Sequence, residues 1–304
     1  MTLLNPVRVP TPVNLHDEVD AAVGALPGRL RAEVDKCALL HGNGNIIAIV
    51  ELSGREDDPA ELLRTGAVVL SDSVTSARID GVLFFYPRHV RGPRMKFFDR
   101  DGTPELMCGN GLRCVARYAV DRGLMPSWSV VVTDDGVKRV RVTDEYTEVA
   151  IGDPREVQKL ADDLWFVFTG VPHLVVLADG VAAVDEVDVA TRGAQLSRDP
   201  ELCARLGYPG GLHVNFAAVQ DRSLVIRTYE VGVEDETQCC GTGATATAYV
   251  GWCAGLVSLP VTLRTRGGEV SVAQRSYGLT LAGPVGYLTE PRRPARRLPI
   301  QSEA

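Results

Sequence analysis

Short runs of β-branched and aromatic residues follow one another along most of the chain. Most are bounded by Gly, Pro, Asp or Asn, which is typical of strands joined by turns. In the first half the runs are 37–40, 46–52, 79–86, 95–98, 130–133, 140–143 and 148–151. In the second half they are 164–169, 173–177, 214–219, 224–229, 261–265, 269–272 and 279–282. The pattern predicts a protein built largely from β-sheet.

Each half also contains one segment with a helical pattern. Residues 111–122 and 243–254 both follow a Gly-rich turn, and each precedes a glycine, which suits a helix C-terminus. The second segment is rich in Ala, Thr and Gly, so that sheet can pack closely around all its sides. We therefore expect an α/β (α+β) fold of two halves, each a curved sheet around one central helix, with the boundary near 152–154.

The two ends of the chain depart from this plan. Residues 1–33 contain several prolines and one amphipathic stretch, and we expect an N-terminal arm or short helix there. Residues 290–304 hold three prolines and four arginines and are expected to form a solvated tail. The first residues lack the basic and apolar segments of a secretory signal, and no apolar run approaches the roughly 20 residues of a membrane span. These features predict a cytoplasmic protein that does not enter a membrane.

Composition narrows the possible functions. The chain has 304 residues, of which 45% are hydrophobic and 23% charged, and its net charge of −7 argues against a partner such as nucleic acid or an anionic membrane. Seven cysteines are too few for a disulfide scaffold, and five scattered histidines without a Cys-x2-Cys pair argue against a zinc site. Only four lysines occur, none in a recognisable motif, so that pyridoxal phosphate is not expected, and no metal site is expected either.

A repeated tetrapeptide stands at the start of both predicted helices. Cys108-Gly109-Asn110-Gly111 and Cys240-Gly241-Thr242-Gly243 both have the form Cys-Gly-polar-Gly and lie 132 residues apart. A helix N-terminus carries unpaired N–H groups and positive partial charge, which favours a thiolate and can hold a carboxylate. The pKa of a thiol in such a place falls from about 8.5 toward about 3.5–7.5.

Two such helices, facing each other, would place one thiol on each side of a carbon next to a bound carboxylate. That arrangement suits removal of a proton from one face and its return to the other, while converging N–H groups stabilise the carbanion. The remaining cysteines are expected to be bystanders. We expect Cys37, Cys114, Cys203 and Cys253 to be buried in the core and Cys239 to pack beside Cys240.

With these motifs and others, the sequence resembles the diaminopimelate epimerase family from about residue 34 to 289. The likeness rests on five blocks, namely His-Gly-Asn-Gly-Asn at 41–45, Phe-Asp-Arg-Asp-Gly-Thr at 98–103, Cys-Gly-Asn-Gly-Leu-Arg-Cys at 108–114, Gly-Val-Pro-His at 170–173 and the stretch 230–243 with the second cysteine motif. The resemblance implies two pseudo-symmetric domains, 34–153 and 154–284, with a final strand at 285–289 returning to the first. It also implies an active site in the cleft between them, no cofactor, and a homodimer.

The family's functional residues carry over to matching positions of this chain. The resemblance makes Cys108 and Cys240 the acid and base. Gly109, Asn110, Gly241 and Thr242 would bind the α-carboxylate and Glu230 the α-ammonium, while Asn45 would line the substrate site. Glu230 and His173 would also tune the pKa of the thiols.

The far end of the predicted substrate site departs from the family. The family binds the distal carboxylate and ammonium of diaminopimelate with an arginine and several amides, and the matching positions here are Gly81, Asp99, Val171, His213 and Val231. Valine cannot grip a carboxylate as an arginine fork does. Asp99 and His213 are expected to contact an amine, a hydroxyl or a ring nitrogen of the substrate, or each other.

We therefore expect an isomerase that moves a proton at the carbon next to a carboxylate, on an amino acid or related acid other than diaminopimelate. Three alternatives remain open from the sequence. They are a genuine diaminopimelate epimerase, an isomerase that shifts a double bond by an allylic 1,3-proton transfer, and a small-molecule binder that does no chemistry.

Overall fold

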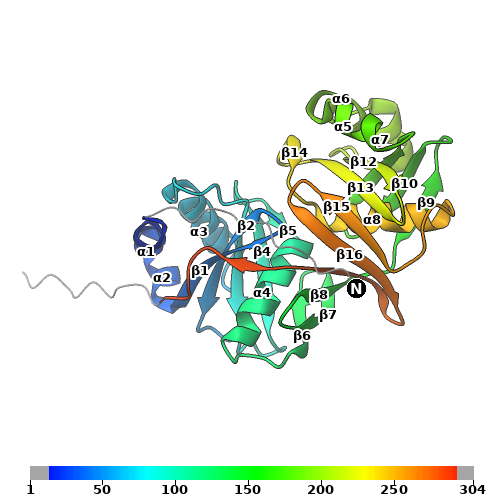
Figure 1. Ribbon diagram of the computed structural model, residues 1–304. Helices are drawn as coiled ribbons and strands as arrows, with labels where there is room; N and C mark the ends of the chain where they lie inside the picture. Colours follow the sequence, from blue (N-terminus) through cyan, green and yellow to red (C-terminus); the bar gives the residue numbers. More distant parts are fainter. Residues whose placement is uncertain (1–13, 293–304) are drawn as a thin grey trace, which may run out of the picture.

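The computed structural model describes residues 14–292, so that the first 13 residues of the predicted arm (1–33) and most of the predicted tail (293–304) lie outside the described residues. Figure 1 shows two lobes side by side, one with helix α4 at its centre and the other with helix α8. The predicted α/β class, with two lobes of mainly antiparallel curved sheet around central helices, is confirmed. Within 14–292 no helix is long and apolar enough to cross a membrane.

The first lobe wraps its sheet around α4, while α1 to α3 cover the outer face (Figure 1). Its helices are α1 (Leu15–Ala25), α2 (Gly28–Glu33), α3 (Ala60–Ser73) and α4 (Gly109–Asp121). Its strands are β1 (Val34–Gly42), β2 (Asn45–Leu52), β3 (Gly81–Tyr86), β4 (Arg94–Asp99), β5 (Pro104–Glu105), β6 (Trp128–Thr133), β7 (Gly136–Val142) and β8 (Thr147–Gly152). The short strand β18 (Gly286–Tyr287) pairs antiparallel with β1, so that this late segment returns to the first lobe.

The second lobe repeats this plan around α8. Its strands are β9 (Arg155–Lys159), β10 (Leu164–Phe168), β11 (Pro172–Leu177), β12 (His213–Gln220), β13 (Ser223–Glu230), β14 (Asp235–Thr237), β15 (Val261–Thr265), β16 (Gly268–Arg275) and β17 (Gly278–Gly283). Its helices are α5 (Val181–Glu186), α6 (Val189–Ser197), α7 (Pro200–Leu206) and α8 (Gly241–Cys253). Strands β11 and β12 run parallel because α5, α6 and α7 form the crossover between them.

The two lobes share backbone pairing and a core. Strand β8 of the first lobe pairs antiparallel with β17 of the second, with Val149 opposite Leu281. One apolar cluster runs from Leu112 and Val115 on α4 to Ala244 and Ala248 on α8. This continuity fixes the starts of the two central helices relative to each other.

Several local expectations need correction. The central helices begin two residues earlier than predicted, at Gly109 and Gly241, because the glycines of the two motifs are helical rather than part of a turn. The hydrophobic pattern also missed α3 and the three crossover helices. Cys253 was expected to be buried, but it is exposed at the end of α8, whereas Cys37, Cys114, Cys203 and Cys239 are buried as expected.

Candidate active site

Cys108 and Cys240 occupy the same structural position in the two lobes. Each is the N-cap of its central helix, with extended backbone, and each sulfur accepts a hydrogen bond from the residue three positions on. The distance is 3.3 Å from the nitrogen of Gly111 to Cys108 Sγ and 3.4 Å from that of Gly243 to Cys240 Sγ. The cysteines therefore take the place that Ser, Thr or Asp usually has at a helix start.

The two helix starts meet at the junction of the lobes. A Cβ atom built on Gly241 would lie 3.4 Å from Gly109 Cα, and one built on Gly109 would lie 3.5 Å from Gly241 Cα. A side chain at position 241 would also lie only 2.8 Å from Leu281. Glycine at both positions lets the positive ends of two helices come together, which makes this junction a place for an anion.

A chain of polar groups in the second lobe ends at Cys240. His173 Nε2 lies 3.0 Å from Thr242 Oγ1, and Thr242 Oγ1 lies 3.4 Å from Cys240 Sγ. Asn215 Nδ2 lies 3.1 Å from His173 Nδ1. Burial beside His213 holds the pKa of His173 well below its usual value, so that the ring is neutral.

The partners of Asn215 determine the direction of these hydrogen bonds. Its Oδ1 accepts from Thr228 Oγ1 at 3.0 Å, and its Nδ2 donates to the carbonyl oxygen of Leu174 at 3.0 Å, so that the amide nitrogen faces His173. His173 therefore accepts at Nδ1 and donates from Nε2 to Thr242, which leaves the Thr242 hydroxyl hydrogen free to point at Cys240 Sγ. Asn215 and Thr228 were not predicted, because no local motif marks them.

The pKa values of the thiols differ from the sequence-based expectation. Burial raises the pKa of Cys108 to about 12, and the charges of Asp99 and Glu230 add to the rise, against the lowering by the Gly111 amide. Burial and the Glu230 carboxylate also raise the pKa of Cys240 well above its usual value. The prediction that the helix start lowers both pKa values is therefore wrong, because loss of hydration outweighs one N–H group.

Glu230, at the end of β13, lies next to Cys240. It accepts a hydrogen bond from Thr237 Oγ1, and burial raises its pKa to about 7. A cation beside Glu230 would compensate its charge and so remove one cause of the high thiol pKa values. An ammonium group of a ligand fits this requirement.

The predicted carboxylate-binding residues are all at the junction, in different roles. Gly109 and Gly241 begin the two helices, and Thr242 presents its hydroxyl to Cys240. Asn110 is buried, and its side chain binds the carbonyl oxygen of Cys239 at 2.7 Å instead of facing a cavity. Asn45, at the start of β2, has a buried Oδ1 without a hydrogen-bond partner among the described residues, as expected of an atom reserved for a ligand.

The five side-chain-pocket positions divide into two groups. His213 Nδ1 accepts from the backbone N–H of Val231 at 3.3 Å, and its ring centroid lies 5.1 Å from that of His173. Burial lowers the pKa of His213 to about 4, so that this ring is also neutral. Val171 lies in the turn before β11, where its carbonyl accepts from Thr169 N.

Gly81 and Asp99 form the second group and are directly opposite each other in the β3–β4 pairing. A Cβ at position 81 would lie 2.3 Å from the Phe97 ring, so Gly81 can offer only its backbone. Asp99 Oδ2 would lie 3.6 Å from a Cβ on Gly232, which places this carboxylate against the second lobe. Asp99 and His213 thus have separate partners.

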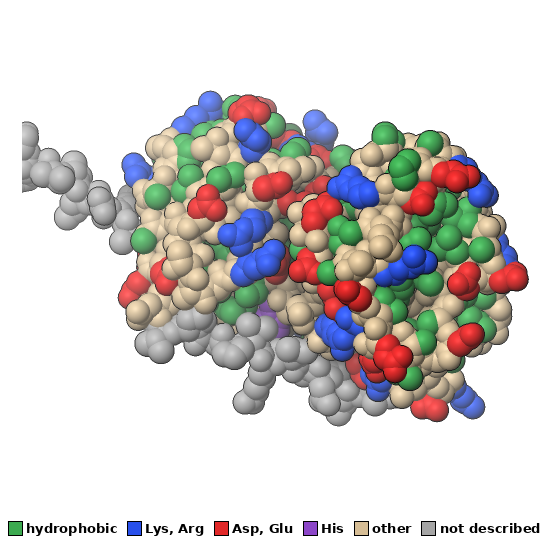
Figure 2. All heavy atoms as spheres, turned by 90° about the horizontal axis from the view of Figure 1, so that it is seen from above, with side chains coloured by type: hydrophobic (Ala, Val, Ile, Leu, Met, Phe, Trp, Pro, Cys, Tyr) green, Lys and Arg blue, Asp and Glu red, His purple; other side chains and the backbone are tan. Residues whose placement is uncertain are grey.

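A small recess adjoins Asp99, with a volume of about 80 Å³. We call it the Asp99 recess, and it is lined by Arg78, Asp80, Asp99, Arg100, Asp101, Gly232 and Val233. Burial raises the pKa of Asp99 to about 7, and the negative charges of Glu105, Glu230, Asp101 and Asp80 add to the rise. Figure 2 shows acidic and basic side chains together along the seam between the lobes.

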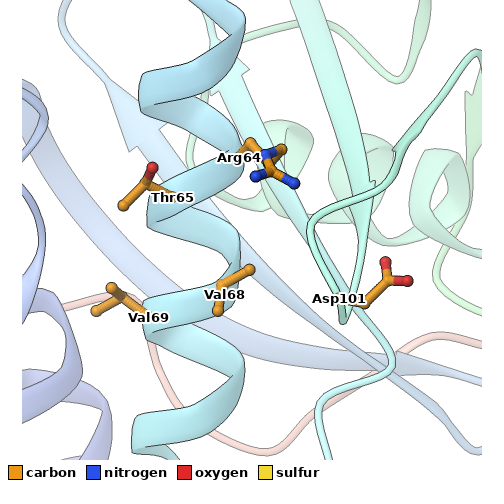
Figure 3. Close-up of a pocket in the computed structure, with 5 residues that line it drawn as sticks. All are labelled: Arg64, Thr65, Val68, Val69 and Asp101. Carbon is orange, nitrogen blue, oxygen red and sulfur yellow. The ribbon is translucent and has the colours of Figure 1, made fainter.

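A larger depression, of about 330 Å³, lies on the outer side of α3. Figure 3 shows Arg64 and Val68 on the side of this helix that faces Asp101, on the loop after β4, whereas Thr65 and Val69 point away from Asp101. It contains neither thiol nor any other predicted site residue. The depression therefore does not belong to the candidate active site, despite its size.

The geometry defines a class of protein, namely an α/β protein with paired helix-capping thiols at a lobe junction. The family model for diaminopimelate epimerase matches residues 37–157 and 165–287, and the chain belongs to this family. A relative named diaminopimelate epimerase from Methanocella arvoryzae is 33% identical over 276 residues, covering 84% of this chain and 95% of the relative. One from Aquifex aeolicus is 34% identical over 251 residues, covering 76% and 86%. The chain is accordingly an enzyme of the isomerase class.

Solved structures share the fold at much lower identity. A phenazine biosynthesis protein of the PhzF family from Bacillus anthracis has a TM-score of 0.63 and 12% identity, covering 84% of this chain and 97% of that one. A hydroxyproline epimerase from Agrobacterium vitis has a TM-score of 0.59 and 15% identity, covering 87% and 93%. These likenesses concern the fold alone.

Proposed function

We propose that the chain inverts the α-carbon of an amino acid by two-base proton transfer between Cys108 and Cys240. The observation that carries this proposal is the meeting of the two helix starts, each capped by a thiol, at Gly109 and Gly241. One bound carboxylate can accept N–H groups from both helices there. The adjacent carbon then lies between two sulfurs that reach it from different lobes.

The reaction needs one thiolate and one thiol. The substrate ammonium pairs with Glu230, which offsets the charge that raises the thiol pKa values. The thiolate takes the α-proton from one face, and the electron pair left on carbon delocalises into the carboxylate, which the helix N–H groups stabilise. The opposite thiol gives its proton to the other face and becomes the thiolate for the reverse reaction.

The hydrogen-bond chain of Asn215, His173 and Thr242 supports one of these thiols. Because His173 donates to Thr242, the Thr242 hydroxyl can donate to a Cys240 thiolate as it forms. A hydrogen bond to the charged form lowers a pKa. His173 therefore acts through Thr242 and not as an acid or base on the substrate.

We further propose diaminopimelate as the substrate, which reverses the order of preference drawn from the sequence. The two relatives described above are named diaminopimelate epimerase, and this chain covers 95% and 86% of their length. The distal end of diaminopimelate is a second ammonium–carboxylate pair, and the Asp99 recess offers both signs of charge. Arg78 and Arg100 would take the distal carboxylate, in place of the arginine missing at Val231, and Asp80 and Asp99 the distal ammonium.

A second candidate is an amino acid with a cationic side chain and no distal carboxylate. Two observations favour it, namely the valines at 171 and 231 and the exposed position of Arg78, whose side chain is 67% exposed. In that case Asp99 alone would bind the far end.

The test is a kinetic assay with LL-diaminopimelate beside a panel of basic, neutral and unsaturated cyclic amino acids, with chiral analysis. The proposal predicts a kcat/KM for diaminopimelate in the range of about 10⁴–10⁸ M⁻¹s⁻¹ and values at least tenfold lower for the others. A basic amino acid as the best substrate would support the second candidate. A moved double bond would indicate the allylic isomerase, and no exchange with any compound would indicate a binder.

The homodimer implied by the family resemblance is also a proposal. Light scattering on the purified chain is expected to give twice the monomer mass, and a monomer that is fully active would refute it.

A further inference from the structure

Arg113 is the largest side chain that the fold buries completely, with 0% exposure. It lies on α4, five residues after Cys108. Its guanidinium donates to Asn110 Oδ1 at 2.6 Å, to Asn43 Oδ1 at 2.8 Å and to the Pro284 carbonyl at 3.1 Å. Among the described residues none of these partners is a carboxylate, and its Nε has no partner. A buried cation without a counter-charge is costly, so that its position requires an explanation.

The backbone around the guanidinium leaves space for it. A Cβ on Gly283 would lie 2.3 Å from Nη1 of Arg113, and one on Gly42 would lie 3.1 Å from Nη2. Two glycines that are far apart in the chain thus leave the space that the guanidinium occupies, and a Cβ at either position would crowd it. The site is built for this side chain.

Both amides that bind Arg113 also bind the second lobe. Asn110 Nδ2 donates to the Cys239 carbonyl at 2.7 Å, and Asn43 Nδ2 donates to the Glu269 carbonyl at 3.0 Å. A guanidinium only donates hydrogen bonds, so that it holds the oxygen of each amide toward itself and turns each NH₂ group toward the second lobe.

The two amide links converge on the segment that carries Cys240. Cys239 is its immediate neighbour in the chain. The turn before Glu269 includes Gly267, whose backbone N–H donates to the Gln238 carbonyl at 2.7 Å. Through the two amides, Arg113 therefore connects the start of α4 with Cys239 and with the turn that binds Gln238, the two residues that precede Cys240 in the chain.

We propose that Arg113 is a positioning residue that sets the placement of Cys240 relative to Cys108 through the amides of Asn110 and Asn43. This inference rests on the proposed function, because the placement matters for transfer of a proton across one carbon. Arg113 and Asn43 are both buried, with Asn43 only 1% exposed, so that neither is presented to a substrate. They act on the placement of the two thiols relative to each other.

Asn43→Asp separates this role from mere structural support. The carboxylate still accepts from Arg113 and gives the buried cation a counter-charge, but it cannot donate to the Glu269 carbonyl when ionised. A purely structural Arg113 predicts unchanged kcat, even where the new carboxylate oxygen faces the carbonyl oxygens of Glu269 and Gly267 and lowers Tm. The positioning role predicts a kcat about tenfold to a hundredfold lower, since displacements near 1 Å have effects of this size, with KM within about threefold of the wild type.

Asn14→Asp, the same change at an exposed residue before α1, is the matched control and is expected to leave kcat and Tm unchanged. Arg113→Lys is the second variant. It keeps the charge, but its three donors sit on one nitrogen instead of on the two nitrogens that bind Asn43 and Asn110, so that the amides must move, and kcat is expected to fall to a similar extent. Full kcat in either Asn43→Asp or Arg113→Lys would overturn the proposal.

A readout that does not depend on turnover distinguishes this inference from the proposed function. Bridging of Cys108 and Cys240 by a short bis-alkylating reagent, followed by peptide mass analysis, reports how closely the thiols approach each other. We expect bridging about tenfold slower in Asn43→Asp than in wild type and Asn14→Asp, for the same geometric reason. If the wild type turns over no amino acid, the proposed function fails, whereas unchanged bridging in Asn43→Asp refutes the role of Arg113.

Discussion

The starts of α4 and α8 have the same backbone and different surroundings. Both are capped by cysteine and both sulfurs accept one N–H group. Cys240 also has a hydroxyl partner, Thr242, which His173 orients. Cys108 is half-buried, has no hydroxyl partner among the described residues, and lies near Asp99, whose charge adds to the rise of its pKa. The difference teaches that the repeated helix start supplies amides for an anion, while the reactivity of each thiol is set by side chains that the two lobes do not share.

Removal of either thiol should have the largest effect. Cys108→Ser and Cys240→Ser are each expected to lower kcat for epimerisation by about 10³-fold, within the usual range for an acid–base group. The serine hydroxyl still caps the helix, so that Tm should change little. Initial rates from both stereoisomers measure the effect.

Cys253→Ser is the matched control, because Cys253 is exposed at the other end of α8. Its activity should equal that of the wild type. If one of the two capping thiols proved dispensable, the two-base account would be wrong.

Loss of the Thr242 hydroxyl should reveal the difference between the two helix starts. Thr242→Val keeps the shape and the backbone N–H but removes the donor to Cys240, and kcat is expected to fall about tenfold, as for loss of one hydrogen bond to a charged group. The pH dependence of iodoacetamide alkylation should shift upward for Cys240 and stay unchanged for Cys108, as peptide mapping can measure. Equal shifts at both thiols would contradict the asymmetry.

The carboxylate of Glu230 should govern activity near neutral pH. Its pKa is raised to about 7 by burial, and only the ionised form attracts an ammonium group. We therefore expect kcat/KM, which reports the free enzyme, to rise as pH increases through about 7. Glu230→Gln should lower kcat/KM and remove the part of this rise that belongs to Glu230, and an unchanged profile would show that another group is responsible.

Folding stability should depend on pH with the opposite sign to activity. Asp99 and Glu230 have pKa values of about 7 in the folded protein, above their usual values of 3.8 and 4.5. At pH values between the usual and the raised pKa values, the folded state binds more protons than the unfolded state. Stability therefore falls as pH rises from about 5 to 8. Asp99→Asn should make the dependence of Tm on pH shallower, and a Tm that rises over this range would contradict the burial of these carboxyls.

The sequence predicted the parts of the molecule that local patterns encode. The strands, the two central helices and the repeated thiol motif follow from hydrophobic runs and from glycine positions near Cys108 and Cys240. Helix α3 was not predicted, because the hydrophobic run 79–86 and its neighbours give a stronger pattern than the helix does. The apolar face of α3 covers a sheet that only the tertiary fold defines.

The rest of the site depends on contacts between distant segments. Asn215 meets His173 because β11 and β12 are parallel neighbours across a crossover of three helices, and no spacing in the sequence reports that register. The thiol pKa values were predicted with the wrong sign, because the helix start was visible in the sequence whereas the burial of Cys108 and Cys240 was not. Arg113 was visible within the first cysteine block, but its links to Asn43 and Pro284 were not.

Incubation of the wild-type enzyme with LL-diaminopimelate in D₂O, stopped at early conversion, tests the central claim most directly. Two thiols on opposite faces predict that the product isomer carries deuterium at the inverted carbon while the recovered substrate carries almost none. Equal deuterium in recovered substrate and product would indicate a single base that exchanges its proton before returning it, and would contradict the account.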